Sequence, residues 1–195
     1  MKTLYLVRHG ETLFNQQNKI QGWCDAPLTE KGIQQALTVK NYFAKRQLTF
    51  DKAYSSTSER ARDTLALITD QPSTCLKDLR EWHFGRLEGE NERINPPLPY
   101  NDFFVSYGGE SQTAFQQRAI EICQKIMQKD GEQILIVSHG AFCGRFREYW
   151  QTHSLTERKV ATIDNCCIFI YQFEAEIFHL TEIISHQEQL LALKK

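Results

Sequence analysis

The chain has 195 residues, of which 41% are hydrophobic and 24% charged, and its formal net charge is −1. This length favours one domain over residues 1–195 with a substantial core, and the composition is that of an ordinary globular protein. A net charge so close to zero gives no general attraction to nucleic acid or to an acidic membrane surface. A site for an anion must therefore come from basic side chains that are clustered locally.

The sequence also argues against export and against a metal finger. No stretch approaches the roughly 18–20 apolar residues of a membrane helix, and the apolar run 3–7 is too short for the core of a signal peptide. The six cysteines have no CxxC spacing. We therefore expect a cytoplasmic protein whose cysteines are reduced.

The first half of the chain alternates predicted strands with predicted helices. Residues 4–7 form a short apolar run, typical of a strand buried on both faces. A helix over 30–44 is predicted behind a Thr29 cap. A second strand ends at residue 56, and Ser58 begins the helix that follows it.

Residues 85–109 interrupt this pattern. Three prolines are followed by Tyr100, Phe103 and Phe104, and we expect an irregular excursion over a site, or a plain surface loop. The aromatic rings would form an apolar wall for the organic part of a substrate, together with Trp23, or would simply fill the core.

The regular pattern returns after this excursion. A helix is predicted over 111–128, a buried strand over 133–138 and a helix over 141–150. The runs 166–174 and 177–184 are β-rich and fit an antiparallel edge, which offers a surface for a homodimer. The order of the elements predicts an α/β fold, a three-layer α/β/α sandwich with a mostly parallel central sheet.

Two distant segments, LYLVRHG (4–10) and ILIVSHG (134–140), follow the same plan. Each is a buried strand, then one polar residue, then His-Gly. The strand that ends at residue 56 leads to Arg60 on the first turn of the next helix. Because ligands bind at the carboxyl ends of parallel strands, we expect Arg8, His9, Arg60 and His139 to surround one crevice.

This set of side chains suits phosphoryl transfer. Two arginines can hold a phosphoryl group through several hydrogen bonds of fixed geometry. A neutral histidine can attack phosphorus and form a covalent intermediate, while the second histidine donates to the phosphoryl oxygens. Such a site requires no metal or other cofactor.

The leaving group needs an acid, and the segment LREWHFGRLEG (79–89) offers Glu81 and Glu88. A carboxyl packed against Trp82 and Phe84 would have a raised pKa. We prefer Glu81, although the local sequence leaves Glu88 open.

The stretch Arg8-His9-Gly10-Glu11-Thr12 resembles the RHGE[TS] signature of the histidine phosphatase superfamily, the phosphoglycerate mutase-like group. Further blocks similar to that family follow in order: QGWCDAPLTEKGIQQA (21–36), Ser55-Ser56 with Arg60-Ala61, LREWHFGRLEG (79–89), GGES (108–111) and Ser138-His139-Gly140. One departure is Thr57-Ser58, where many members have Pro-Leu, a difference that leaves Arg60 in register.

The resemblance implies a phosphoglycerate mutase-like fold, with His9 as the phosphorylated nucleophile and Glu81 as the proton donor. Arg8, Arg60 and His139 would form the phosphate pocket. Other positions match residues that line the pocket in relatives: Thr12, Asn15, Gln21, Gly22 and Gly140. The chain looks most like the broad-specificity bacterial phosphatases of this group, so we expect it to hydrolyse a small-molecule phosphomonoester without a metal.

Three alternatives to a metal-independent phosphatase differ in what they require. A cofactor-dependent phosphoglycerate mutase must exclude water, but its longer chain and typical RHYG are absent here, where EWHFG stands. A non-catalytic phosphate-binding module would not need the complete catalytic set. A metallohydrolase would need ligand spacing that the sequence lacks, and the two arginines would repel the ion.

Overall fold

The computed structural model describes residues 1–129, 131–156 and 162–194. Its strands form one six-stranded sheet in the order β3-β2-β4-β1-β5-β6. The first four strands in this order pair in parallel, and β5 and β6 pair antiparallel at one edge. The strands are β1 (Lys2–Arg8), β2 (Lys52–Ser56), β3 (Ser73–Leu76), β4 (Gln133–Ser138), β5 (Ile168–Glu174) and β6 (Ile177–Ile184).

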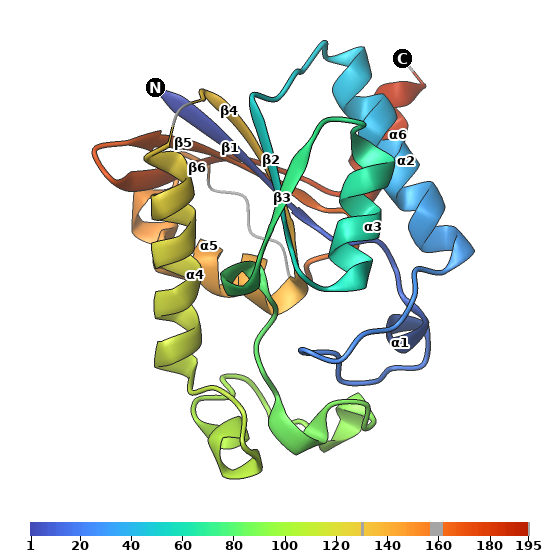
Figure 1. The fold of residues 1–195 in the computed structure, drawn as a ribbon, viewed down its shortest axis with the longest axis vertical. Coiled ribbons are helices and arrows are strands. Elements are labelled where there is room, and N and C mark those ends of the chain that lie inside the picture. The colour runs from blue at the N-terminus through green and yellow to red at the C-terminus, as the bar shows by residue number, and fades with distance from the viewer. Residues whose placement is uncertain (130, 157–161, 195) are drawn as a thin grey trace.

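Helices cover both faces of this sheet, as Figure 1 shows. The helices α2, α3 and α6 lie on one face, and α4 and α5 lie on the other. This arrangement confirms the predicted three-layer α/β/α sandwich. The α-helices are α1 (Leu13–Gln16), α2 (Glu30–Lys45), α3 (Glu59–Ile68), α4 (Gln112–Met127), α5 (Gly140–Tyr149) and α6 (His186–Leu193).

The two faces of β1 explain why the sheet lies between two cores. Leu4 and Leu6 point into the cluster under α4 and α5, whereas Tyr5 and Val7 point into the cluster under α2 and α3. Successive side chains of a strand point to opposite faces, so an uninterrupted apolar run requires cover on both. The central strand therefore places the residues that follow it at the edge between two helical layers.

The excursion over 85–109 packs back onto the protein at the lower end of Figure 1. Phe104 is fully buried against Trp82 and Phe84, so it belongs to the core. The short 3₁₀ helices of the described residues are η1 (Lys77–Leu79), η2 (Gly85–Leu87), η3 (Glu92–Ile94), η4 (Phe103–Tyr107) and η5 (Gln151–His153).

The strand predicted from residue 166 starts two residues later, at Ile168. Cys166 has a φ of 59°, a left-handed conformation that no regular strand contains. Its backbone N–H donates to the carbonyl of Arg8 at 3.0 Å. This turn connects β5 to the end of β1 and so to the histidine that follows it.

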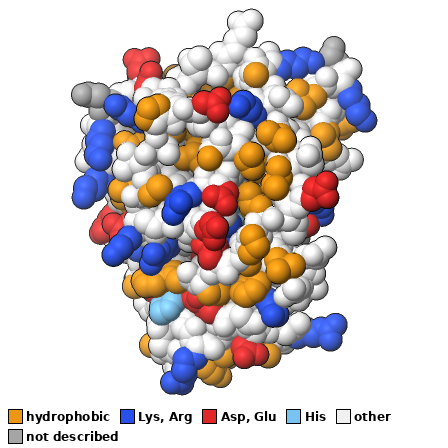
Figure 2. All heavy atoms as spheres, turned by 45° about the vertical axis from the view of Figure 1, so that its right-hand side comes forward, with side chains coloured by type: hydrophobic (Ala, Val, Ile, Leu, Met, Phe, Trp, Pro, Cys, Tyr) orange, Lys and Arg blue, Asp and Glu red, His pale blue; other side chains and the backbone are white. Residues whose placement is uncertain are grey.

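None of the helices within the described ranges has the length and apolarity that a bilayer crossing requires. On the face seen in Figure 2, basic and acidic side chains are interspersed with hydrophobic ones. This mixture agrees with the near-zero net charge of the chain.

Candidate active site

The pairing of β1 with β4 brings the two histidines together. Arg8 lies opposite Ser138 in the parallel register, so the residues that follow them, His9 and His139, leave the sheet side by side. The backbone N–H of His9 donates to the carbonyl of Ser138 at 3.0 Å. The two rings meet edge to face with their centroids 5.3 Å apart, as the matching strand ends predicted.

His9 presents one nitrogen for chemistry. Its Nδ1 lies 2.7 Å from the carbonyl oxygen of Gly10, and since a carbonyl only accepts, Nδ1 carries the proton. The Nε2 lone pair then faces Arg60, whose Nε–H donates to it at 3.3 Å. Burial, together with the charges of Arg60 and Arg8, lowers the pKa of His9 well below its ordinary value. The imidazole is therefore neutral at pH 7.

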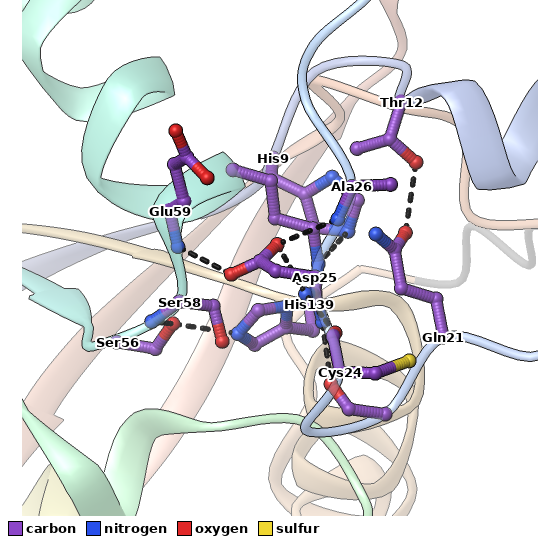
Figure 3. Close-up of polar contacts among 12 residues, drawn as sticks. His9, Thr12, Gln21, Cys24, Asp25, Ala26, Ser56, Ser58, Glu59 and His139 are labelled. Atoms are coloured by element: carbon purple, nitrogen blue, oxygen red, sulfur yellow. Dashed lines mark hydrogen bonds and ion pairs between the residues drawn. The ribbon is translucent and has the colours of Figure 1, made fainter. Parts of the chain in front are cut away.

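Arg60 is fully buried and held by the loop that follows α1. Its Nη1 donates to the Cys24 carbonyl at 3.0 Å and forms an ion pair with Asp25 at 2.9 Å, and its Nη2 donates to the Gly22 carbonyl at 2.8 Å. Asp25 also accepts from the backbone N–H of Glu59 at the start of α3 (Figure 3). Asp25 is a residue that sequence reasoning missed, although it lies within the recognised 21–36 block.

The Thr57-Ser58 departure leaves Arg60 in place. Ser58 stands at the N-cap of α3 without a side-chain capping bond, and its backbone N–H donates to Ser56 Oγ at 3.2 Å. Thr57 accepts a hydrogen bond from Arg80 at 2.6 Å. These two bonds hold the entry to α3, together with the bond from the Glu59 N–H to Asp25.

Arg8 lies at the other side of His9, above the start of α5. A Cβ added to Gly140 would lie 3.3 Å from Arg8 Nε, so the glycine lets the guanidinium approach the helix. One Arg8 nitrogen donates to the Ile163 carbonyl. Among the described residues, nothing pairs with the buried Nε, which leaves this donor available to an anion.

His139 has a fixed tautomer of its own. Its Nε2 lies 2.7 Å from Ser56 Oγ, which already accepts from the Ser58 N–H (Figure 3). A hydroxyl can accept twice but donates once, and among the described residues Nε2 is the one acceptor within reach of the Ser56 hydroxyl hydrogen. The hydroxyl therefore donates to Nε2, and the proton of His139 sits on Nδ1. That buried Nδ1 has no partner among the described residues. Burial and the nearby Arg60 charge lower the pKa of His139 well below its ordinary value.

The structure separates the two candidate acids. Glu81 is buried, and its carboxylate accepts from the backbone N–H groups of Ala141 at 2.8 Å and Phe142 at 2.9 Å, on the first turn of α5, and of Trp82 at 3.0 Å. Burial raises the pKa of Glu81, although these hydrogen bonds act in the opposite direction.

Glu88 instead accepts hydrogen bonds from loop backbone. It accepts from the backbone N–H groups of Cys24 at 2.5 Å and Phe84 at 3.1 Å, and it does not line the cleft beside His9. Of the two glutamates left open by the sequence, Glu81 is the one that faces this cleft.

Amide side chains complete the wall beside His9. Thr12 Oγ1 donates to Gln21 Oε1 at 2.8 Å, and nothing in the described ranges accepts from the buried Gln21 Nε2. Asn15 Oδ1 accepts from the Thr12 N–H and from Asn165 Nδ2, each at 3.1 Å. Asn165 also donates to the His9 carbonyl at 3.1 Å. Sequence reasoning missed Asn165, which lies outside the motifs considered above.

These groups open into a cleft of about 1460 Å³ between the excursion and α5. Arg8, His9, Asn15, Gln21, Glu81 and Gly140 line it. Four predicted site residues, Arg60, His139, Thr12 and Gly22, are not among the residues that line it. Arg60 and His139 adjoin His9, while Thr12 bonds to Gln21 and Gly22 bonds to Arg60. Tyr100 also lines the cleft, whereas Trp23 stacks on His83 with centroids 4.3 Å apart. Within the described ranges, no three His, Cys, Asp or Glu side chains are grouped to hold a metal ion.

The geometry is that of a phosphoryl-transfer site built on histidine. The family model of the histidine phosphatase superfamily (branch 1) matches residues 4–185, and the chain belongs to this family. The sequence is 33% identical over 155 residues to a metal-independent phosphoserine phosphatase of Arabidopsis thaliana, a match that covers 70% of this chain and 63% of the plant protein.

Two further relatives have different activities, the first a mutase and the second a phosphatase. A 2,3-bisphosphoglycerate-dependent phosphoglycerate mutase of Hamiltonella defensa is 27% identical over 220 residues, which covers 91% of this chain and 88% of the mutase. A crystal structure of a phosphoserine phosphatase from Entamoeba histolytica, in complex with 3-phosphoglyceric acid, superposes with a TM-score of 0.77 at 28% identity. This superposition covers 97% of this chain and 100% of that one.

Proposed function

We propose that this protein is a phosphomonoester hydrolase that works without a metal, through a phosphohistidine intermediate on His9. The observation that carries the proposal is the state of His9, which is buried and neutral, with its Nδ1–H donating to the Gly10 carbonyl and the lone pair of Nε2 directed at Arg60. Glu81 lines the same cleft and supplies a carboxyl with a raised pKa. The phosphatases among its relatives support this choice.

In the first step the phosphate of the ester binds between the guanidinium groups of Arg8 and Arg60. The Nε–H of Arg60 turns from His9 to a phosphoryl oxygen, which frees the lone pair. His9 Nε2 forms a bond to phosphorus while the bond to the ester oxygen breaks. Glu81 gives its proton to that leaving oxygen, so an alcohol departs.

In the second step water attacks the phosphohistidine. The Glu81 carboxylate takes a proton from the water while the oxygen–phosphorus bond forms and the nitrogen–phosphorus bond breaks. Inorganic phosphate leaves, and His9 and Glu81 return to their initial states. In both steps His139 Nδ1–H, Asn15 and Gln21 donate to the phosphoryl oxygens. Thr12 and Gly22 act from behind by holding Gln21 and Arg60, and Gly140 makes room for Arg8.

The experiment is phosphate release from p-nitrophenyl phosphate, with acid-labile labelling of the protein during turnover. We expect both in the wild type in the presence of EDTA, and neither in His9→Ala. Persistent turnover in that variant would contradict the mechanism. Exchange between 3- and 2-phosphoglycerate without phosphate release would instead identify a mutase, the second candidate, which the likeness to the Hamiltonella enzyme favours.

Phosphate binding without any turnover would indicate a non-catalytic module. The cytoplasmic location, the single domain over residues 1–195 and a homodimer through the 166–184 segment stay predictions.

A further inference from the structure

One wall of the cleft is a single face of α5. Ala141, Gly144, Arg145 and Glu148 line it, and their spacing of three and four residues places them on one side of the helix. Arg147, further from Ala141 along the helix, also lines the cleft. Four residues of helix advance about 6 Å. Arg145 therefore lies about 6 Å beyond Ala141, whose N–H holds the Glu81 carboxylate. It is the first charged side chain on this wall beyond the phosphate end of the cleft.

The position of Gly144 leaves that stretch of wall open. Between Ala141 and Arg145 the helix presents only a methyl group and a hydrogen. Among the described residues, the atom nearest to a Cβ on Gly144 would be Ile163 Cδ1, at 3.4 Å. A leaving group that extends from the ester oxygen can follow this open strip of the helix to the guanidinium of Arg145.

The contacts of Arg145 allow it to change partners. Its side chain is 14% exposed and pairs with Glu148, Nη1 to Oε2, at 2.5 Å. The Glu148 side chain is 52% exposed, and an exposed pair three residues apart on a helix contributes only about 0.2–0.5 kcal/mol. The guanidinium also lies 5.9 Å from the ring centroid of Trp82, which holds it against the opposite wall.

We propose that Arg145 recognises a carboxylate on the leaving group, so that the substrates are phosphomonoesters of small hydroxy acids. This inference rests on the proposed phosphatase function. A short carbon chain spans the distance from the ester oxygen to Arg145. The carboxylate takes the place of Glu148 in a planar, two-bonded pair, one negative charge replacing another. The exchange moves Glu148 into water at little cost, because its side chain is already half exposed.

The test compares two esters that differ only in the carboxylate: O-phosphoserine and O-phosphoethanolamine. For the wild type we expect kcat/KM for phosphoserine to exceed that for phosphoethanolamine by about tenfold to a hundredfold, as for a hydrogen bond to a charged group. The difference should reside mainly in KM. Arg145→Gln should reduce this ratio to within about threefold of one, and Arg145→Lys should keep part of it.

Arg62→Gln is the matched control, because Arg62 is an exposed arginine of α3 that does not line the cleft. It should keep the wild-type ratio. A wild-type ratio near one, or an unchanged ratio in Arg145→Gln, would overturn the inference. Selection for a second phosphate instead, seen as preference for propanediol bisphosphate over both test esters, would also overturn it.

Failure of the proposed function is recognised separately. If the wild type releases no phosphate from p-nitrophenyl phosphate or from either ester, hydrolysis is excluded. The role of Arg145 is then tested by measuring the affinities of the same two esters by calorimetry. Equal affinities would overturn its role, and a preference for phosphoserine that Arg145→Gln abolishes would support it.

Discussion

Replacing Glu81 by glutamine changes one atom in a carboxylate whose surroundings consist of donors. Oε1 accepts from the backbone N–H groups of Trp82 and Phe142, and Oε2 accepts from that of Ala141. The glutamine oxygen can keep the first two bonds. Its amide nitrogen then faces the Ala141 N–H, donor against donor, so one buried N–H loses its partner.

The cost in stability follows from these contacts. An unsatisfied buried donor costs about 1–3 kcal/mol, and loss of a negative charge at a helix N-terminus costs about 0.3–1 kcal/mol more. Relief of the burial that raises the pKa of Glu81 offsets part of this sum. The expected loss of about 1–4 kcal/mol is smaller than the roughly 5–15 kcal/mol of a typical domain. The variant should therefore fold and can be assayed.

The effect on activity depends on the leaving group. General acid catalysis contributes about 10²–10⁴-fold, but only where the departing oxygen needs a proton. We expect Glu81→Gln to reduce kcat on an alkyl phosphate such as glycerol 3-phosphate by that factor. The loss on p-nitrophenyl phosphate should be clearly smaller, because nitrophenolate leaves readily without a proton. Inhibition by inorganic phosphate should change little.

The pH profile gives a second measure of the same role. The wild type needs a neutral His9 and a protonated Glu81, so activity rises as the pH passes the lowered pKa of His9 and falls as it passes the raised pKa of Glu81. The optimum is therefore expected between these two pKa values. In Glu81→Gln the alkaline fall should disappear, since glutamine does not titrate.

Glu88→Gln is the matched control, since Glu88 also accepts backbone N–H bonds but does not line the cleft. It should lower the rates on alkyl and nitrophenyl esters by the same factor. An equal loss on both esters in Glu81→Gln, with phosphate binding weakened in parallel, would show that Glu81 is structural and refute the reasoning.

The remaining predictions concern positioning and stability. Ser56→Ala removes the hydroxyl that fixes the His139 tautomer, so it should lower kcat about tenfold with less effect on KM. NMR of the His139 ring should then show both tautomers, and a single tautomer with normal kcat would contradict this. Gly32→Ala should lower the melting temperature despite better helix propensity, because the new methyl group would overlap the Glu11 carbonyl. The lowered pKa values of His9 and His139 mean that the unfolded chain binds more protons below about pH 6.5, so stability is lost as the pH falls below that value. Urea unfolding at pH 7 and 5 should show a smaller loss in His139→Gln than in the wild type.

The sequence predicted the parts of the site that strands position. Apolar runs buried on both faces mark β1 and β4, and parallel strands present their carboxyl ends at one edge. The meeting of His9 with His139 and Arg60 follows from these rules. The matching length of the two segments before each histidine also indicates their common register.

Other parts depend on contacts that sequence spacing does not encode. The choice between Glu81 and Glu88 is decided by which carboxylate meets the first turn of α5, a helix 60 residues further along the chain. Asn165 reaches the site because the turn at Cys166 hydrogen-bonds to the end of β1. Asp25 stands in a recognised block, but its pairing with Arg60 appears only in three dimensions.

Four polar side chains of the site share one arrangement. One atom of each side chain is hydrogen-bonded within the protein, which leaves the other atom to interact with the phosphate. The pairs, each a side chain with the partner that fixes it, are His9 with Gly10, His139 with Ser56, Gln21 with Thr12, and Asn15 with Asn165. Donors oriented before the substrate arrives need no reorganisation during reaction, which is where such sites gain most of their rate. Substitution of a fixing partner should therefore reduce kcat more than binding, even though these partners lie behind the groups that would touch the phosphate.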